Sequence, residues 1–143
     1  MKKSTSNQKQ LLFIILEFLS GLGFSILGGH IYLLFDSNSL KASIFYTFLV
    51  MFVSMFIGVT IMGYFHFKSI TRSEDFSGAV GYSFLGMLLS LILYVALIIA
   101  LYQYLPDYLS SVVLPIVLPL MGAVIGVNFL IYKKKIRRVQ GVH

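Results

Sequence analysis

Residues 107–138 read DYLSSVVLPIVLPLMGAVIGVNFLIYKKKIRR, and this stretch decides the fold. From Tyr108 to Tyr132 it contains no charged residue. An α-helix of this length spans roughly 37 Å at about 1.5 Å per residue, which is enough to cross a hydrocarbon core of about 30 Å. The stretch is therefore predicted to span a membrane, and the basic residues that follow it are predicted to lie on the cytoplasmic side.

The composition indicates an integral membrane protein. Of 143 residues, 58% are hydrophobic and 11% are charged, whereas a soluble domain has roughly 25% charged residues. The net charge of +6 comes from basic residues that flank apolar segments. This pattern indicates membrane topology and not the basic patch of a nucleic-acid-binding surface. The absence of cysteine excludes disulfides and thiolate metal sites.

Three further apolar segments precede the last one. We predict membrane spans over residues 11–35, 42–67, 76–105 and 108–132, which together form a transmembrane domain from 11 to 132. Basic tails of residues 1–10 and 133–143 flank this domain. Four spans place both tails on one side, together with ten of the eleven basic residues, and leave only Lys41 on the other. The expected fold is an all-α bundle of four transmembrane helices, in the cytoplasmic membrane, with both termini inside.

Each predicted span contains small residues four positions apart, a spacing that lets helix backbones approach closely in lipid. The predicted helix-packing residues are Gly21, Ser25, Gly29, Ser54, Gly58, Gly86, Ser90, Gly122 and Gly126. They predict contacts within the chain, with a second copy or with another membrane protein. Residues 23–28 and 81–86 match at four of six positions, which leaves open a duplicated two-helix hairpin.

One polar side chain from each span is expected in the cytoplasmic third of the membrane. Glu17 is the only charged residue inside any predicted span. A carboxylate there is costly and suggests a functional site, although the positive end of a helix dipole also favours it structurally. His66, Ser83 and Asn128 lie at similar predicted depths. If all four face inward, Glu17 and His66 share a proton, and the cluster either binds a substrate or ion or holds the helices together.

No metal, cofactor or catalytic constellation is expected. In the predicted topology His30 lies near the outer side of the membrane and His66 near the inner side, so they cannot hold one haem or metal ion between them. The sequence contains no P-loop, HExxH or nucleophile-elbow pattern, and the predicted loops are too short to build a pocket. We therefore expect a protein that is not an enzyme.

The fourth span ends in Asn128-Phe129 and is followed by three lysines that begin at Lys133. With four spans and basic termini, this end resembles the GtrA-like family of small four-helix membrane proteins. That resemblance implies an association with lipid-linked sugar transfer or translocation. The sequence departs from the family because it has no tryptophan in the tail, and because Tyr64-Phe65 stands where a second asparagine-bearing helix end is expected.

Two functions follow as hypotheses. The first is an accessory or interaction subunit that binds another membrane component through the small-residue helix faces. The alternative is an oligomeric carrier, flippase or channel for an ion, a small molecule or a lipid-linked substrate, and it would use the polar cluster. The expected partners are the lipid bilayer and either a second copy of the chain or another membrane protein.

Overall fold

The computed structural model describes residues 2–35, 40–71, 76–101, 103–104, 106 and 113–139. These residues form the four helices α1 (Lys2–Phe35), α2 (Leu40–Thr71), α3 (Ser77–Leu101) and α4 (Leu114–Val139). Each helix contains a segment that is long and apolar enough to cross a membrane: Gln8–Leu34, Phe45–Ile70, Ser77–Leu101 and Leu114–Lys133. The prediction of an all-α chain with four helices of this kind is confirmed.

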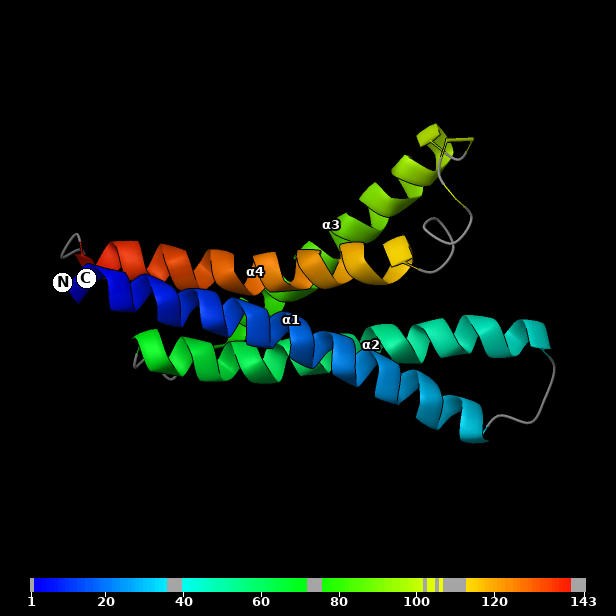
Figure 1. Ribbon diagram of the computed structural model, residues 1–143, viewed down its shortest axis with the longest axis horizontal. Helices are drawn as coiled ribbons and strands as arrows, with labels where there is room; N and C mark the ends of the chain where they lie inside the picture. The colour runs from blue at the N-terminus through cyan, green and yellow to red at the C-terminus, as the bar shows by residue number, and fades with distance from the viewer. Residues whose placement is uncertain are drawn as a thin grey trace.

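The helices form two hairpins that pack against each other through α2 and α4 (Figure 1). α1 packs along α2, and α3 packs along α4. The start of α1, the end of α2 and the end of α4 lie at one end of the molecule, which we call the basic end (Figure 1). Toward its Leu101 end, α3 diverges from the other three helices (Figure 1). α3 therefore departs from the bundle at the end opposite the basic end (Figure 1).

The helix bounds differ from the predicted spans at both tails, at both ends of α2 and in α3. α1 begins at Lys2 and α4 ends at Val139, so the basic residues continue these helices. Lysine, glutamine and arginine are good helix formers, and no glycine or proline interrupts them there. α3 ends at Leu101, where its carbonyl accepts a hydrogen bond from the Tyr104 amide in a turn before Pro106. The start of the fourth predicted span lies outside the described residues, as do residues 36–39 and 72–75 of the predicted connections, whereas residues 68–71 continue α2.

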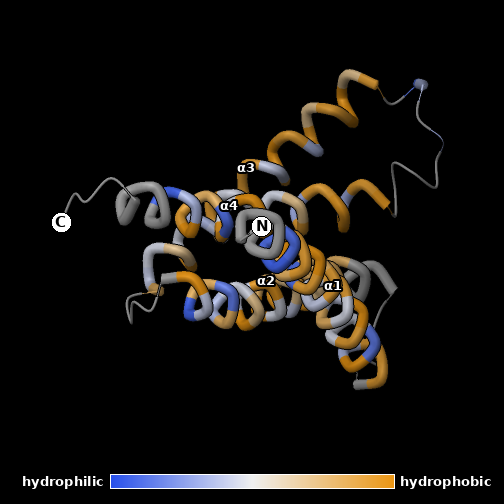
Figure 2. Tube along the Cα trace, turned by 60° about the vertical axis from the view of Figure 1, so that its left-hand side comes forward, coloured by the Kyte–Doolittle hydropathy of each residue, from blue (hydrophilic) through white to orange (hydrophobic). Residues whose placement is uncertain are grey.

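α4 is the central helix of the bundle. Of its membrane-length segment, 56% is buried, compared with 6 to 22% for the other three helices. Most large apolar side chains of α1, α2 and α3 point outward, and the helices are apolar along most of their length (Figure 2). Helices that are apolar on their outer faces as well as toward the core suit a lipid environment, because lipid and not water then surrounds the outer faces.

Small residues form the contact between α3 and α4. Gly122 faces Gly86 and Ser90, and Gly126 faces the backbone of Tyr82. A Cβ atom added at Gly126 would overlap the Tyr82 carbonyl oxygen, and one at Gly122 would overlap the Gly86 carbonyl oxygen. Only glycine permits this separation between the two helix backbones.

The contact between α1 and α2 has the same character. Gly58 lies against the backbone of Ser20, whose hydroxyl donates a 3.0 Å hydrogen bond to the Gly58 carbonyl. Gly29 lies against Met51, and Gly21 lies against Val59 of α2 and also against Leu120 of α4. Ser54 lies against Gly28, and Ser25 is fully buried. The predicted small-residue faces therefore contact helices of the same chain.

Candidate functional site

Three of the four polar residues that were expected to cluster lie together near the basic end. Glu17 of α1 is fully buried, and its Oε1 lies 2.6 Å from Nδ1 of His66 on α2. The side-chain amide nitrogen of Asn128 on α4 donates to Oε2 of the same carboxyl group. Glu17 thereby joins three helices, and we call these three residues the polar triad.

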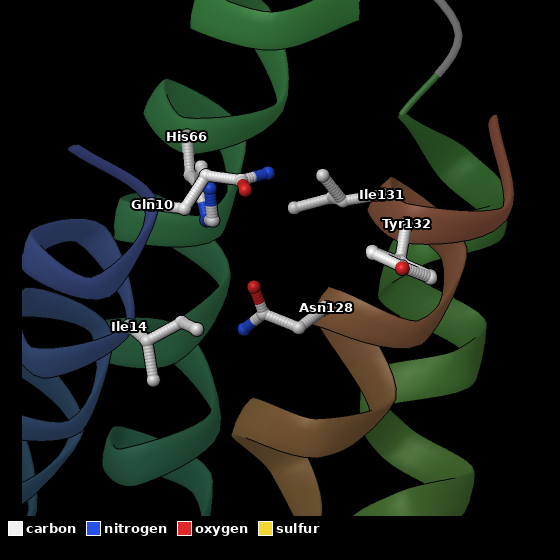
Figure 3. A pocket seen from close by; sticks show the side chains of 6 residues that line it. All are labelled: Gln10, Ile14, His66, Asn128, Ile131 and Tyr132. Atoms are coloured by element: carbon white, nitrogen blue, oxygen red, sulfur yellow. The ribbon is translucent and has the colours of Figure 1, made fainter. Parts of the chain in front are cut away.

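The orientation of the Asn128 amide follows from its partners. Its Nδ2 donates both to Glu17 and, over 2.8 Å, to the backbone carbonyl of Val124 one turn earlier. Both partners are acceptors, so the NH₂ group and not the oxygen must face them. The amide oxygen is turned toward the side where His66 and Gln10 lie (Figure 3). Asn128 thus presents an acceptor in that direction while it fixes the carboxyl group.

His66 is held by a hydrogen bond at Nδ1 and by one stacked ring, but it retains one unsatisfied nitrogen. Its ring stacks on Phe13 with a centroid separation of 4.7 Å and an interplanar angle of 7°. The side chain is 1% exposed, and Nε2 is buried without a hydrogen-bond partner among the described residues. An unsatisfied buried polar group costs about 1–3 kcal/mol, and in a native structure it calls for a physical explanation.

Ser83 does not join the polar triad. It is fully buried, and its hydroxyl donates a 3.1 Å hydrogen bond to the Ala123 carbonyl of α4. Ala123 precedes Asn128 by five residues, or about 7.5 Å of helix. α3 packs on the glycine face of α4, so Ser83 reaches the α4 backbone at this deeper level.

His30 is also separate from the triad. It is exposed on α1, and its Nδ1 lies 2.9 Å from the Ile26 carbonyl of the same helix. Among the described residues, no group of three or more histidine, aspartate or glutamate side chains could hold a metal ion.

A cavity of about 310 Å³ adjoins the triad (Figure 3). Its lining consists of Gln10, Ile14, His66, Asn128, Ile131 and Tyr132. These residues belong to α1, α2 and α4, and no described residue of α3 contributes. Glu17 does not line the cavity, so a ligand would meet His66 and Asn128 and not the carboxyl group.

Gln10 and Tyr132 were missed as candidate residues. A sequence signal for both existed: Gln10 is the last polar residue before the first apolar run, and Tyr132 is the last residue before the lysines. Gln10 precedes the start of the first span and Tyr132 ends the fourth span. Because both of these span ends are predicted on the same side of the membrane, the two residues are expected at the same depth. The sequence does not show that α1 and α4 face each other, so it could not predict that these two residues line one cavity.

Comparisons with known proteins identify no relative. No protein-family model matches the sequence, and no curated protein or solved structure matches it. The resemblance to the GtrA-like family therefore stays a prediction, and the site has to be interpreted from its own geometry.

Two substitutions of Glu17 separate hydrogen bonding from charge. Glu17→Leu leaves Nδ1 of His66 and one of the two N–H groups of the Asn128 amide without a partner, and each unsatisfied group is expected to cost about 1–3 kcal/mol. Glu17→Gln is expected to cost less than about 1 kcal/mol, because its oxygen can accept from Asn128 while its NH₂ group donates to His66. Thermal unfolding of the purified variants in detergent measures both losses. Equal losses would contradict a carboxyl group held by these two hydrogen bonds.

Proposed function

We propose that this chain is a non-enzymatic, multi-pass protein of the cytoplasmic membrane that binds a ligand in the cavity beside the polar triad, as a carrier. One observation supports this most strongly: the buried Nε2 of His66 has no partner among the described residues, and His66 lines the cavity. A convergence of polar groups from three helices on one pocket is typical of a binding site. Nε2 itself has almost no accessible surface, so a ligand in the cavity would reach it only after the lining side chains move.

The interaction-subunit hypothesis has less support. It relied on small-residue faces that would be available to another membrane component. Gly58, Gly86, Gly122 and Gly126 instead lie against the chain's own helices. Because three of the four helices enclose the cavity, we propose that a complete transport pathway needs a second copy or another membrane protein.

The proposed orientation places the basic end in the cytoplasm. Lys2 and Lys3 begin α1, Lys68 lies in the last turn of α2, and the basic run from Lys133 ends α4. All three helix ends lie at the same end of the bundle (Figure 1). An excess of lysine and arginine favours the cytoplasmic side, and the cavity then faces that side.

Single-cysteine labelling tests this orientation, because the chain contains no cysteine of its own. Ser69 lies near the basic end of α2, and Gln103 lies just after α3 at the opposite end; both are exposed. In intact cells, a membrane-impermeant maleimide is expected to label Gln103→Cys and to label Ser69→Cys only after permeabilisation. The reverse pattern would show that the basic end lies outside.

A matched pair of tryptophan substitutions tests whether the cavity binds a ligand. Both Ile14 and the next residue, Ile15, are exposed, but only Ile14 lines the cavity. Native mass spectrometry of the chain, extracted in mild detergent, is expected to detect a bound species in the wild type and in Ile15→Trp. Ile14→Trp should lose that species because its larger side chain occupies the cavity. Identical spectra for both variants would contradict a ligand site here.

A further inference from the structure

We propose that the ligand of this cavity carries a hydroxyl group, which donates a hydrogen bond to the side-chain amide oxygen, Oδ1, of Asn128. This assignment names the ligand class of the carrier proposed above, and it rests on that function. It follows from the direction of the Asn128 amide, the accessibility of its oxygen and the charges around the cavity.

The amide of Asn128 is held in one orientation by two acceptors. Its NH₂ group donates to Oε2 of Glu17 and to the backbone carbonyl of Val124. Because the Val124 carbonyl can only accept, the NH₂ group faces it whether or not Glu17 carries a proton. Oδ1 therefore points away from both partners, toward the side of the cavity where Gln10 lies (Figure 3). Asn128 thus presents a fixed acceptor to the cavity.

The Asn128 oxygen is accessible and has no partner in the chain. No described residue donates a hydrogen bond to it. Among the described residues, the buried polar atoms without a partner are Oγ of Ser25, Oγ1 of Thr60 and Nε2 of His66. Oδ1 of Asn128 is not one of them, so it is reached from the cavity that Asn128 lines. An accessible acceptor that the fold holds in place selects a ligand that supplies a donor.

A metal cation has no adequate set of ligands in this cavity. The oxygen-bearing side chains of its lining belong to Gln10, Asn128 and Tyr132, and all of them are uncharged residues. Glu17 does not line the cavity, and each of its carboxyl oxygens already has a partner in the chain. Hard metal cations are held by several oxygen ligands that usually include carboxylates. The donor is therefore an organic group.

The charges around the cavity favour a hydroxyl group over an ammonium group as this donor. Lys9 and Lys133 are exposed, and they directly neighbour the cavity-lining Gln10 and Tyr132 in sequence. Their positive charges repel a cation. They attract a bare oxyanion, but all of its oxygens are acceptors and cannot bond to Oδ1. A hydroxyl group donates without a positive charge, and it can also accept from the Tyr132 hydroxyl.

Two sources of the hydroxyl group are compatible with the cavity. Ile14 and Ile131 supply apolar surface for the carbon skeleton of a small alcohol. The volume of about 310 Å³ lies at the lower end of the range for small-molecule pockets, roughly 300–1,000 Å³. It suits a free polyol of the size of glycerol, or the glycerol headgroup of a phospholipid whose phosphate Lys9 and Lys133 attract.

Solid-state NMR of the full chain in nanodiscs tests the assignment directly. Asparagine is labelled with carbon-13, and its three signals are assigned with Asn7→Gln and Asn38→Gln. In phosphatidylcholine nanodiscs, a through-space correlation between Cγ of Asn128 and added carbon-13 glycerol is expected if the ligand is a free polyol. The same correlation with the labelled headgroup of phosphatidylglycerol, without free glycerol, would identify a lipid.

Phosphatidylethanol is the matched control lipid, because it has the same charge as phosphatidylglycerol but no hydroxyl group in its headgroup. Its labelled headgroup should give no correlation with Cγ of Asn128. An equal correlation with phosphatidylethanol would show that charge and not a hydroxyl group brings the headgroup to the cavity. That result, or no correlation with glycerol from either source, would overturn the proposal.

Variants distinguish this proposal from the proposed carrier function. Asn128→Leu removes the acceptor and should weaken binding of the glycerol group roughly two- to tenfold. Ser83 does not line the cavity, so Ser83→Ala should leave binding unchanged. If Asn128→Leu does not fold, the wild-type correlation still decides. A co-purifying ligand that Ile14→Trp loses, but that contains no hydroxyl group, would overturn the hydroxyl assignment alone. No cavity-dependent ligand at all would overturn both.

Discussion

The hydrogen-bonded carboxyl group of Glu17 is the constraint on which the basic end of the bundle depends. A fully buried carboxyl group is unfavourable unless its oxygens are satisfied, and here α2 and α4 supply one partner each. Because the three partners come from different helices, satisfying Glu17 sets the separation and register of α1, α2 and α4. The same geometry leaves Nε2 of His66 directed away from the carboxyl group, and it turns the amide oxygen of Asn128 toward the side of the cavity where Gln10 lies (Figure 3).

Packing and polar chemistry are divided between different helix faces. The glycines of α4 meet α3 at backbone distance, and Ser83 reinforces that contact by donating to Ala123. The face of α4 that carries Asn128 meets α1 and α2 instead. α3 therefore stabilises α4 without closing the cavity. This division explains how a chain of four helices can be tightly packed and still have an unfilled volume, lined in part by His66 and Asn128, at one end.

The four helices and three members of the polar triad could be predicted from the sequence for clear physical reasons. Apolar length sets the helices, and a charge or amide inside an apolar run stands out because it is costly there. The predicted depth of Ser83, however, could not exclude it from the triad. The direction of its side chain depends on which face of α4 meets α3, and the sequence does not show this. Helix ends were also missed: Lys2 and Val139 lie beyond the apolar runs, because helix propensity does not stop at the membrane border.

A double-mutant cycle between Glu17 and Asn128 tests the central claim most directly. The free energy of unfolding in detergent would be measured for Glu17→Leu, Asn128→Leu and the double variant, with Glu17→Leu and Ser83→Ala as the control pair. If Glu17 and Asn128 are bonded, the double variant should lose less stability than the sum of the two single losses, by about 0.5–3 kcal/mol, whereas the control pair should be additive. Additive losses for Glu17 and Asn128 would contradict a carboxyl group that holds the three helices together.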